Sequence, residues 1–135
     1  MVDIENEVYT KVLTAVRADS SFSNITASQV VSYDPAVFPC FYLEETDNYS
    51  VTATQDSTHN DNHSVVTYEV NIYSKKKNGS KAECKKIAQI IDSKFNELGF
   101  TRVTKQYFNL PDASGCRLFL RYTAIVGADK TIYRR

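Results

Sequence analysis

The sequence has few of the residues from which catalytic and cofactor sites are built. Its 135 residues include only two histidines and four glycines, and the glycines are too scattered to form a phosphate-cradling loop. Neither histidine is accompanied by a nucleophile motif such as GxSxG, so neither is expected to act as a catalytic base. The sequence therefore predicts that the protein is not an enzyme and holds no nucleotide or other cofactor.

A metal site is not expected either. His59 and His63 lie four residues apart, with Asp61 between them, but their neighbours do not favour the helix that would bring the two rings together. Residues 56–61 lack the glycine and the terminal glutamate of a calcium-binding loop. We interpret this segment as a solvated loop.

The three cysteines contain no CxxC pair, and each lies within an apolar strand or helix pattern. Cys40, Cys84 and Cys116 therefore predict buried thiols in a reducing compartment, in place of disulfides or metal ligands. The first twelve residues lack the basic and apolar regions of a secretory signal, and no apolar run approaches the ~20 residues of a membrane span. We expect a protein that is made in the cytosol and makes no membrane contact.

An excess of either charge is absent as well. Sixteen Lys and Arg residues balance sixteen Asp and Glu residues, so no overall field draws the chain toward nucleic acid or an anionic surface. The same balance leaves self-association unopposed by net charge. The length fits a single domain, residues 1–135, with enough apolar surface to bury a core of its own.

Two amphipathic helices are predicted. Over residues 3–18, apolar side chains recur at three- and four-residue spacing, and Asp3 is placed to cap the start. Over residues 80–98, Ser80 and Glu83 have the spacing of a capping box, and Gly99 is placed to end the helix in the left-handed conformation. The apolar stripe of this second helix consists of Cys84, Ile87, Ala88, Ile91, Phe95 and Leu98.

Five strands are predicted around the helices. The first two cover residues 29–33 and 40–46, and the third covers residues 64–74, with one face on a core and the other mostly in water. The last two, residues 100–108 and 116–126, form a hairpin around a turn at residues 110–114.

The resulting order, α-β-β-β-α-β-β, predicts an α+β fold with an antiparallel or mixed β-sheet and two helices packed on one face. Residues 47–62 form a polar segment that is longer than an ordinary hairpin loop. The weak apolar alternation at Tyr49, Val51 and Ala53 favours a long β-hairpin-like excursion over a flexible arm.

Candidate interface residues lie in this excursion, in the basic turn at residues 75–79, on the outer face of the last strand and at the C-terminal end. They are Tyr49, Val51, Thr52, Lys75, Lys76, Lys77, Asn78, Arg117, Phe119, Arg121 and Tyr133. Tyr and Arg commonly anchor protein interfaces, and Tyr73 is also expected to be exposed. Alternatives stay open: a solvated or phosphate-binding surface for the lysines, and an outer face covered by the chain's own helix or tail.

The sequence YEVNIYSKKKNGSKAECKKIAQIIDSKFNELGFTR, residues 68–102, is followed by RLFLRYTAIV and a terminal IYRR. This stretch resembles the tail terminator, or tail completion, proteins of long-tailed bacteriophages and their prophages, which act in head-tail joining. The resemblance extends in layout over essentially the whole chain and is most specific over residues 66–126. It implies a structural protein that forms a ring, usually a hexamer, which caps the tail tube and needs no cofactor.

The resemblance also implies partners and a location. The partners would be further copies of the chain, the major tail tube protein and the head-side connector or stopper protein, with DNA passing through the ring without sequence-specific binding. The protein would be assembled in the host cytoplasm and lie at the tail-neck junction of the virion. Residues 47–62 and 75–79 would then contact neighbouring subunits or the tube.

Two other functions remain open at this point. The first is a head-completion or stopper protein of the neck, which also forms rings of small subunits. The second belongs to another class, a small cytosolic nucleic-acid-binding module, whose retention on DNA would depend on salt.

Overall fold

The computed structural model describes residues 1–30, 35–51, 63–110 and 115–133. Within these residues the elements are α1 (Glu5–Arg17), the 3₁₀ helix η1 (Ser20–Phe22), β1 (Thr26–Ser28), β2 (Cys40–Ser50), β3 (His63–Ser74), α2 (Ser80–Leu98), β4 (Thr101–Asn109), β5 (Cys116–Gly127) and β6 (Ile132–Tyr133). The strands form one sheet in the order β1-β2-β3-β5-β4, and β6 pairs with the end of β5. The β1 and β2 pair is parallel and the other pairs are antiparallel, so the sheet is mixed.

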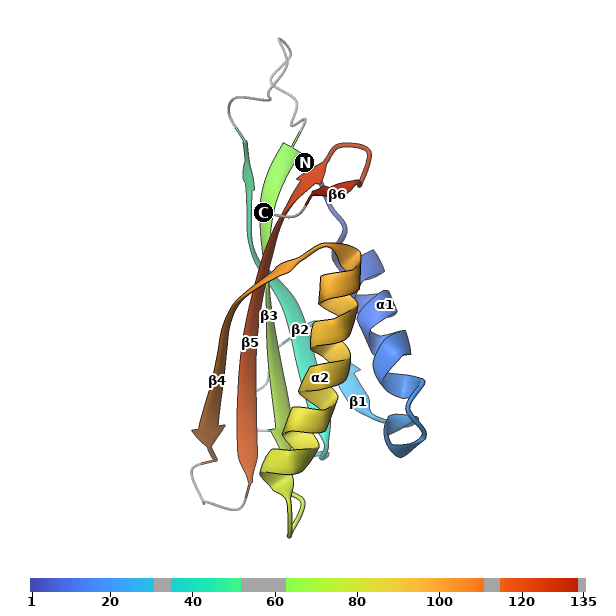
Figure 1. Cartoon of the computed structure of the whole chain (residues 1–135), viewed down its shortest axis with the longest axis vertical. Coiled ribbons are helices and arrows are strands. Elements are labelled where there is room, and N and C mark those ends of the chain that lie inside the picture. The colour runs from blue at the N-terminus through green and yellow to red at the C-terminus, as the bar shows by residue number, and fades with distance from the viewer. Residues whose placement is uncertain (31–34, 52–62, 111–114, 134–135) are drawn as a thin grey trace.

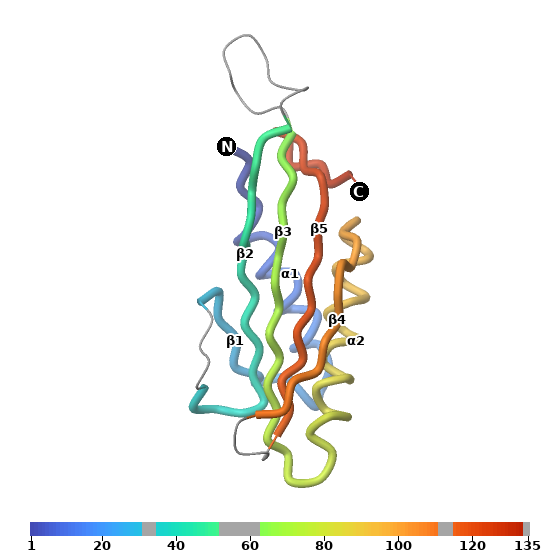
Figure 2. Tube along the Cα trace, turned by 90° about the vertical axis from the view of Figure 1, so that its left-hand side faces the viewer, coloured from blue at the N-terminus to red at the C-terminus, as the bar shows by residue number. Residues whose placement is uncertain are grey.

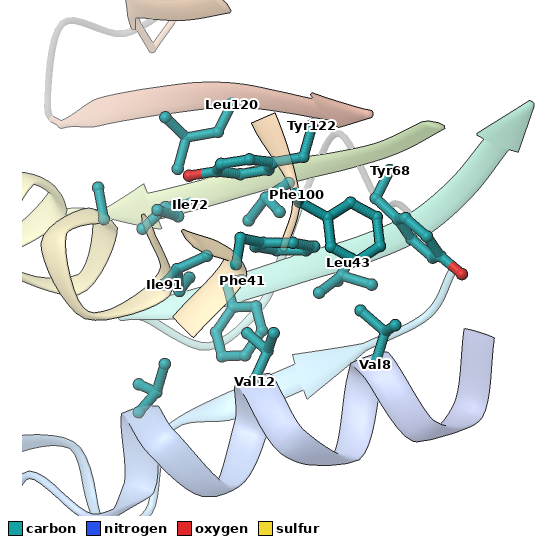
Figure 3. Packing of buried hydrophobic residues seen from close by; sticks show 14 of the residues in the cluster. Val8, Val12, Phe41, Leu43, Tyr68, Ile72, Ile91, Phe100, Leu120 and Tyr122 are labelled. Atoms are coloured by element: carbon teal, nitrogen blue, oxygen red, sulfur yellow. The ribbon is translucent and has the colours of Figure 1, made fainter. Parts of the chain in front are cut away.

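Both long helices pack on the same face of the sheet (Figure 1). Their apolar stripes meet the inward side chains of β2, β3 and β5, and together these residues form the main core (Figure 3). Figure 2 looks onto the opposite face of the sheet, which no helix covers in the described part of the chain. The predicted α+β fold, with two helices on one face of a mixed sheet, is confirmed.

Four aromatic rings form the centre of this core. Phe95 on α2 stacks on Tyr122 of β5, and Phe100 meets Phe95 edge to face with centroids 5.2 Å apart. Tyr68 of β3 meets Phe100 in the same way at 5.5 Å. Such aromatic pairs stabilise a core beyond the area that they bury. The predicted stripe of α2 is confirmed, with all its members buried except the partly buried Leu98.

Two of the buried tyrosines send their hydroxyls to carboxylates at the margin of the core. Tyr122 donates a hydrogen bond to Asp92 at 2.8 Å, and Tyr68 donates one to Glu45 at 3.0 Å. Burial and the adjacent carboxylate raise the pKa of both phenols, so each remains a donor. A buried polar atom that is satisfied in this way costs the core little.

The helix starts differ from the predicted caps. At α1 the cap position is Ile4, and Asp3 lies one residue before it, where its carboxylate accepts a hydrogen bond from the Glu5 amide at 3.1 Å. At α2 the cap position is Gly79, with φ of 93°, so that Ser80 is the first helical residue. The predicted capping box of Ser80 and Glu83 is therefore wrong.

Glu83 has a tertiary partner in place of a local one. Its carboxylate accepts a hydrogen bond of 2.7 Å from the hydroxyl of Ser74, the last residue of β3. This contact joins the end of the strand to the first turn of α2. At the other end, Gly99 has the predicted left-handed conformation, with φ of 102°, and the Phe100 amide donates to the Phe95 carbonyl.

The first strand lies earlier than predicted. β1 covers Thr26–Ser28, whereas residues 29 and 30 form a bend and the rest of the predicted strand lies outside the described residues. The Ser28 hydroxyl accepts a hydrogen bond from the Val30 amide, a local turn that competes with strand pairing. Val30 is 75% exposed, so its apolar character did not indicate a buried strand.

The second strand is longer than predicted. β2 continues through a bulge between Glu45 and Asp47 and stays paired with β3 as far as Ser50. The Val51 amide then donates to the His63 carbonyl at 2.9 Å. The predicted end of the strand at residue 46 is wrong, whereas the predicted hairpin-like pairing is confirmed for residues 47–50 of the excursion. Thr52 and the remainder of the excursion lie outside the described residues.

The outer face of β3 is less exposed to water than predicted. Tyr73 is 1% exposed and packs with Cys40 and Tyr42 in a second, smaller cluster, against the partly buried Phe38 and Leu110. Val65 and Asn71 on the same face are also buried, whereas Thr67 and Glu69 are half-buried. The predicted exposure of Tyr73 is wrong, because segments before β2 and after β4 cover this end of the face.

All three cysteines are buried and free, as predicted. The Cys84 thiol donates to the carbonyl of Cys116 at 3.4 Å and to that of Ile72 at 3.7 Å, which ties α2 to the two central strands. Burial raises the pKa of Cys40 to about 11 and also raises the pKa of the other two thiols. The protonated, unreactive form is therefore favoured at each position.

Candidate interface

The outer face of β5 carries the predicted arginine and aromatic residues. Arg117, Phe119 and Arg121 alternate with inward, buried residues, so that all three lie on the face away from the helices. A carboxylate oxygen of Glu69 on β3 accepts from Nε of Arg121 at 2.9 Å and lies 2.8 Å from Nη2 of the same guanidinium. The guanidinium carbon of Arg121 lies 5.4 Å from the centre of the Phe119 ring. The guanidinium is thus held between a carboxylate and an aromatic ring.

Arg117 is held in a similar way. Its Nε donates to the Asn71 side chain at 2.8 Å, and its guanidinium carbon lies 5.0 Å from the centre of the Phe108 ring on β4. Phe108 itself is 42% exposed. Side chains fixed before a partner arrives lose less conformational entropy on binding, which suits these arginines to an interface.

A second group lies at the end of the sheet from which the excursion leaves. Tyr49 pairs with Val65, Val65 with Ile125, and Ile125 with Tyr133, so the four side chains form one row across β2, β3, β5 and β6. Tyr49 and Tyr133 are both 46% exposed, and Val51 next to the row is half-buried. Tertiary pairing thus brings together two predicted residues that lie more than eighty positions apart in the sequence.

The basic turn lies at the opposite end of β3. Lys75, Lys76, Lys77 and Asn78 are all exposed, as expected for a surface turn, and the Lys75 ammonium lies 4.8 Å from the centre of the Phe38 ring. Figure 1 shows this turn and the paired ends of β2 and β3 near Tyr49 at opposite ends of the long axis. Those of the predicted residues that the structure describes therefore form no single patch: they occupy two ends of the sheet and the open face between them.

Phe108 and the partners of the two arginines were not predicted from the sequence. A bulge between Arg102 and Thr104 shifts the alternation in β4, so that Phe108 faces outward opposite Arg117. The pattern TRVTKQYFN carries no mark of this bulge, because a bulge depends on how the strand pairs. The alternation of β3 is enough to place Glu69 and Asn71 on its outer face, but their arginine partners could be assigned only from the strand register.

The described residues hold no group of three or more His, Cys, Asp and Glu side chains that could bind a metal ion. Of the pair considered in the sequence, His59 lies outside the described residues, and His63 packs its ring 5.4 Å from that of Tyr133. Among the described helices none is long and apolar enough to cross a membrane.

Comparison with known proteins gives a match by fold. No protein-family model and no curated protein matches the sequence. Among solved structures, the fold is similar to that of a chain in the virion of a native gene transfer agent (GTA) particle, with a TM-score of 0.61. The similarity covers 87% of this chain and 92% of that chain at 16% sequence identity. The two chains therefore share a fold over nearly their whole lengths.

Proposed function

We propose that this chain is a structural protein of a phage-like virion and that it acts there as the tail terminator. The observation that carries the proposal is the shared fold with a chain of a gene transfer agent virion, which extends over 87% of this chain and 92% of the other. The resemblance of residues 68–102 to phage tail terminators supports the same assignment independently, since it rests on sequence. In this role the protein works through its surfaces and catalyses no reaction.

The surfaces suit a subunit that has several neighbours. A closed ring is built from heterologous contacts, in which one patch of a subunit meets a different patch of the next. The two ends of the sheet are then free for partners along the ring axis: the tail tube and the head-side connector. The row that contains Tyr49 and Tyr133 lies at one end and the turn Lys75–Asn78 at the other. We assign one end to each partner.

The open face with Arg117 and Arg121 adds a third contact area. Both guanidinium groups are already held against aromatic rings, and arginine and aromatic side chains are the usual anchors of protein interfaces. This face favours the proposal over a nucleic-acid module, because the guanidinium of Arg121 is already paired with the carboxylate of Glu69.

The test is a stop codon at Lys11 in the phage or prophage that encodes the chain, with the wild-type gene supplied in trans as the control. Electron micrographs should show DNA-filled heads without tails, together with tails of irregular length. Tails of normal length beside heads that have lost their DNA would indicate a stopper instead. Normal virions would exclude any structural role in the neck or tail.

A further inference from the structure

We propose that the groove between α2 and β4 receives the acidic edge of a second copy of this chain, so that copies join head to tail. The inference deepens the proposed ring by naming its contact surfaces, and rests on the proposed function only for the closure of the chain of contacts into a ring. The head-to-tail contact itself is inferred from where the charged residues lie and from the strand register of the sheet.

Charge is divided between two parts of the molecule, although its sum is zero. Residues 1–30 and 35–51, which include α1, β1 and β2, contain seven Asp and Glu and two Lys and Arg, a net charge of −5. Residues 63–110 and 115–127, which include α2 and β3 to β5, contain four Asp and Glu and eleven Lys and Arg, a net charge of +7. Each copy therefore carries the charge complement of another copy.

The basic part contains a groove of about 320 Å³ between α2 and β4. Lys85 and Asp92 line it from the helix, and Arg102 and Lys105 line it from the strand. Asp92 already accepts hydrogen bonds from Arg102 at 3.1 Å and from the Tyr122 hydroxyl at 2.8 Å. Lys85 and Lys105 are exposed and form no ion pair with any residue that the structure describes, so positive charge remains in excess.

Positive charge continues beyond this groove along β4, where two lysines approach the same tyrosine. The ammonium groups of Lys81 and Lys105 lie 4.7 Å and 5.2 Å from the centre of the Tyr107 ring. Two like charges therefore share one aromatic ring. A carboxylate placed between the two lysines would be attracted to both.

The acidic edge lies on β2. β1 pairs only with Cys40–Tyr42, so from Glu44 onward β2 is the edge of the sheet among the described residues. Glu44, Glu45 and Asp47 follow there, close to Asp3 and Glu5 at the start of α1. Partial burial, together with nearby carboxylates, raises the pKa of Glu44 and of Glu45. Lysines from a neighbouring subunit would offset the repulsion between these carboxylates.

The register places the two surfaces at the same height of the sheet. Glu45 pairs with Tyr68, Tyr68 with Tyr122, and Tyr122 with Arg102, so that one row runs from the acidic edge to the groove. The two surfaces lie on opposite sides of the sheet, at β2 and at β4 (Figure 2). A second copy displaced sideways therefore meets the groove with its acidic edge, and the contact repeats with the next copy.

A nucleic acid is the other polyanion that could enter the groove. The matching of opposite charge at the same height on the opposite edge favours a second copy, because a phosphate backbone would require no acidic edge at all. Nucleic acid binding is therefore an outcome that the experiment must separate from self-association.

The experiment uses two charge-reversed variants of the purified full chain. The groove variant carries Lys85→Glu and Lys105→Glu, and the edge variant carries Glu44→Lys and Asp47→Lys. In sedimentation velocity at about 0.01 M salt, where the Debye length is about 30 Å, each variant alone should show an association constant reduced at least about tenfold. An equal mixture should recover association, because in alternating order every contact again joins opposite charges.

The matched control carries Lys11→Glu and Lys86→Glu, which change the net charge as much as the groove variant does but lie outside both surfaces. It should associate as the wild type does. Circular dichroism checks that all variants are folded, and about 1 M salt should weaken the wild-type association because it shortens the Debye length to about 3 Å.

Three results would overturn the inference: a wild-type chain that stays monomeric at about 1 mM protein and low salt, a mixture that does not recover association, or a groove variant that loses only the binding of a fluorescent DNA duplex. None of these depends on the virion. The two proposals can also fail separately. If the mixed variants recover association but the stop-codon phage makes normal virions, the contact between copies stands and the terminator role is excluded.

Discussion

The ring of Phe95 on α2 lies parallel to the ring of Tyr122 on β5, with centroids 4.1 Å apart and planes 8° apart. This pair joins the second helix to the strand that carries Arg117, Phe119 and Arg121. The helix therefore supports the candidate interface from behind the sheet.

Removal of this ring should destabilise the protein strongly. Phe95→Ala removes a fully buried side chain that three other rings surround, and we expect a loss of about 3–5 kcal/mol in the free energy of unfolding. Phe108→Ala is the control, since Phe108 is exposed on the outer face, and it should cost less than about 1 kcal/mol. Urea denaturation monitored by circular dichroism measures both. Equal losses would contradict the arrangement of the core.

The start of α2 gives a sharper comparison between two serines. Ser74→Ala removes the 2.7 Å hydrogen bond to the Glu83 carboxylate and should cost about 1.5–3 kcal/mol. Ser80→Ala should cost less than about 0.5 kcal/mol, because Ser80 is the first helical residue and Gly79 holds the cap position. Thermal or urea unfolding decides the order. A larger loss for Ser80→Ala would restore the capping box.

The two left-handed glycines at the ends of α2 should respond differently to alanine. Each substitution costs about 1 kcal/mol because an L side chain is disfavoured at positive φ. At Gly99 the added methyl would also lie 3.2 Å from Cγ2 of Ile132, whereas at Gly79 its nearest neighbour is 4.0 Å away. Gly99→Ala should therefore lower the melting temperature more than Gly79→Ala. The reverse order would contradict the packing of β6 against the helix end.

The thiols should be unreactive in the folded protein. Cys40, Cys84 and Cys116 are buried, and burial raises the pKa of each, that of Cys40 to about 11. At pH 8 a thiol reagent such as Ellman's reagent should label none of them rapidly, and addition of denaturant should release all three. Rapid labelling of one thiol before unfolding would show that its site opens readily.

Glu44 should make stability depend on pH. Because its pKa is raised above the ordinary 4.5 in the folded chain, its ionisation costs stability once the pH exceeds that value and costs nothing well below it. Glu44→Gln should therefore stabilise the protein at pH 7 by about 0.5 kcal/mol and leave it unchanged near pH 3. Unfolding at low protein concentration keeps self-association out of the measurement without screening the charge of Glu44. A stabilisation that is equal at both pH values would contradict the ionic origin of this effect.

Much of the fold could be predicted from local patterns. The stripe of α2 and the alternation of β3 and β5 are strongly periodic, and one face of each must be buried whatever its partner is. The predictions failed where a competing interaction lay outside the local window. Glu83 has the spacing of a capping box but bonds to Ser74, and Tyr73 has the alternation of an outer-face residue but is covered by Phe38 and Leu110.

The candidate interface shows the same division. The sequence placed Arg117, Phe119 and Arg121 together on one strand face, and strand alternation alone was enough for this. The partners of the two arginines on β3 and β4, and the row that joins Tyr49 to Tyr133, depend on pairing between segments distant in sequence. No periodic pattern within one segment contains that information.

The sequence by itself determined the element types, the faces that fold inward and the fate of the thiols, because burial of apolar side chains follows a period that neighbouring residues set. Only the tertiary structure decided the register that aligns Glu45 with Arg102 across four strands, and with it the separation of an acidic edge from a basic groove in a chain of zero net charge. The physical reason is that the register of the sheet decides which charged residues, distant in sequence, lie in the same row and at the same edge of the sheet. The composition gives only the net charge of the chain.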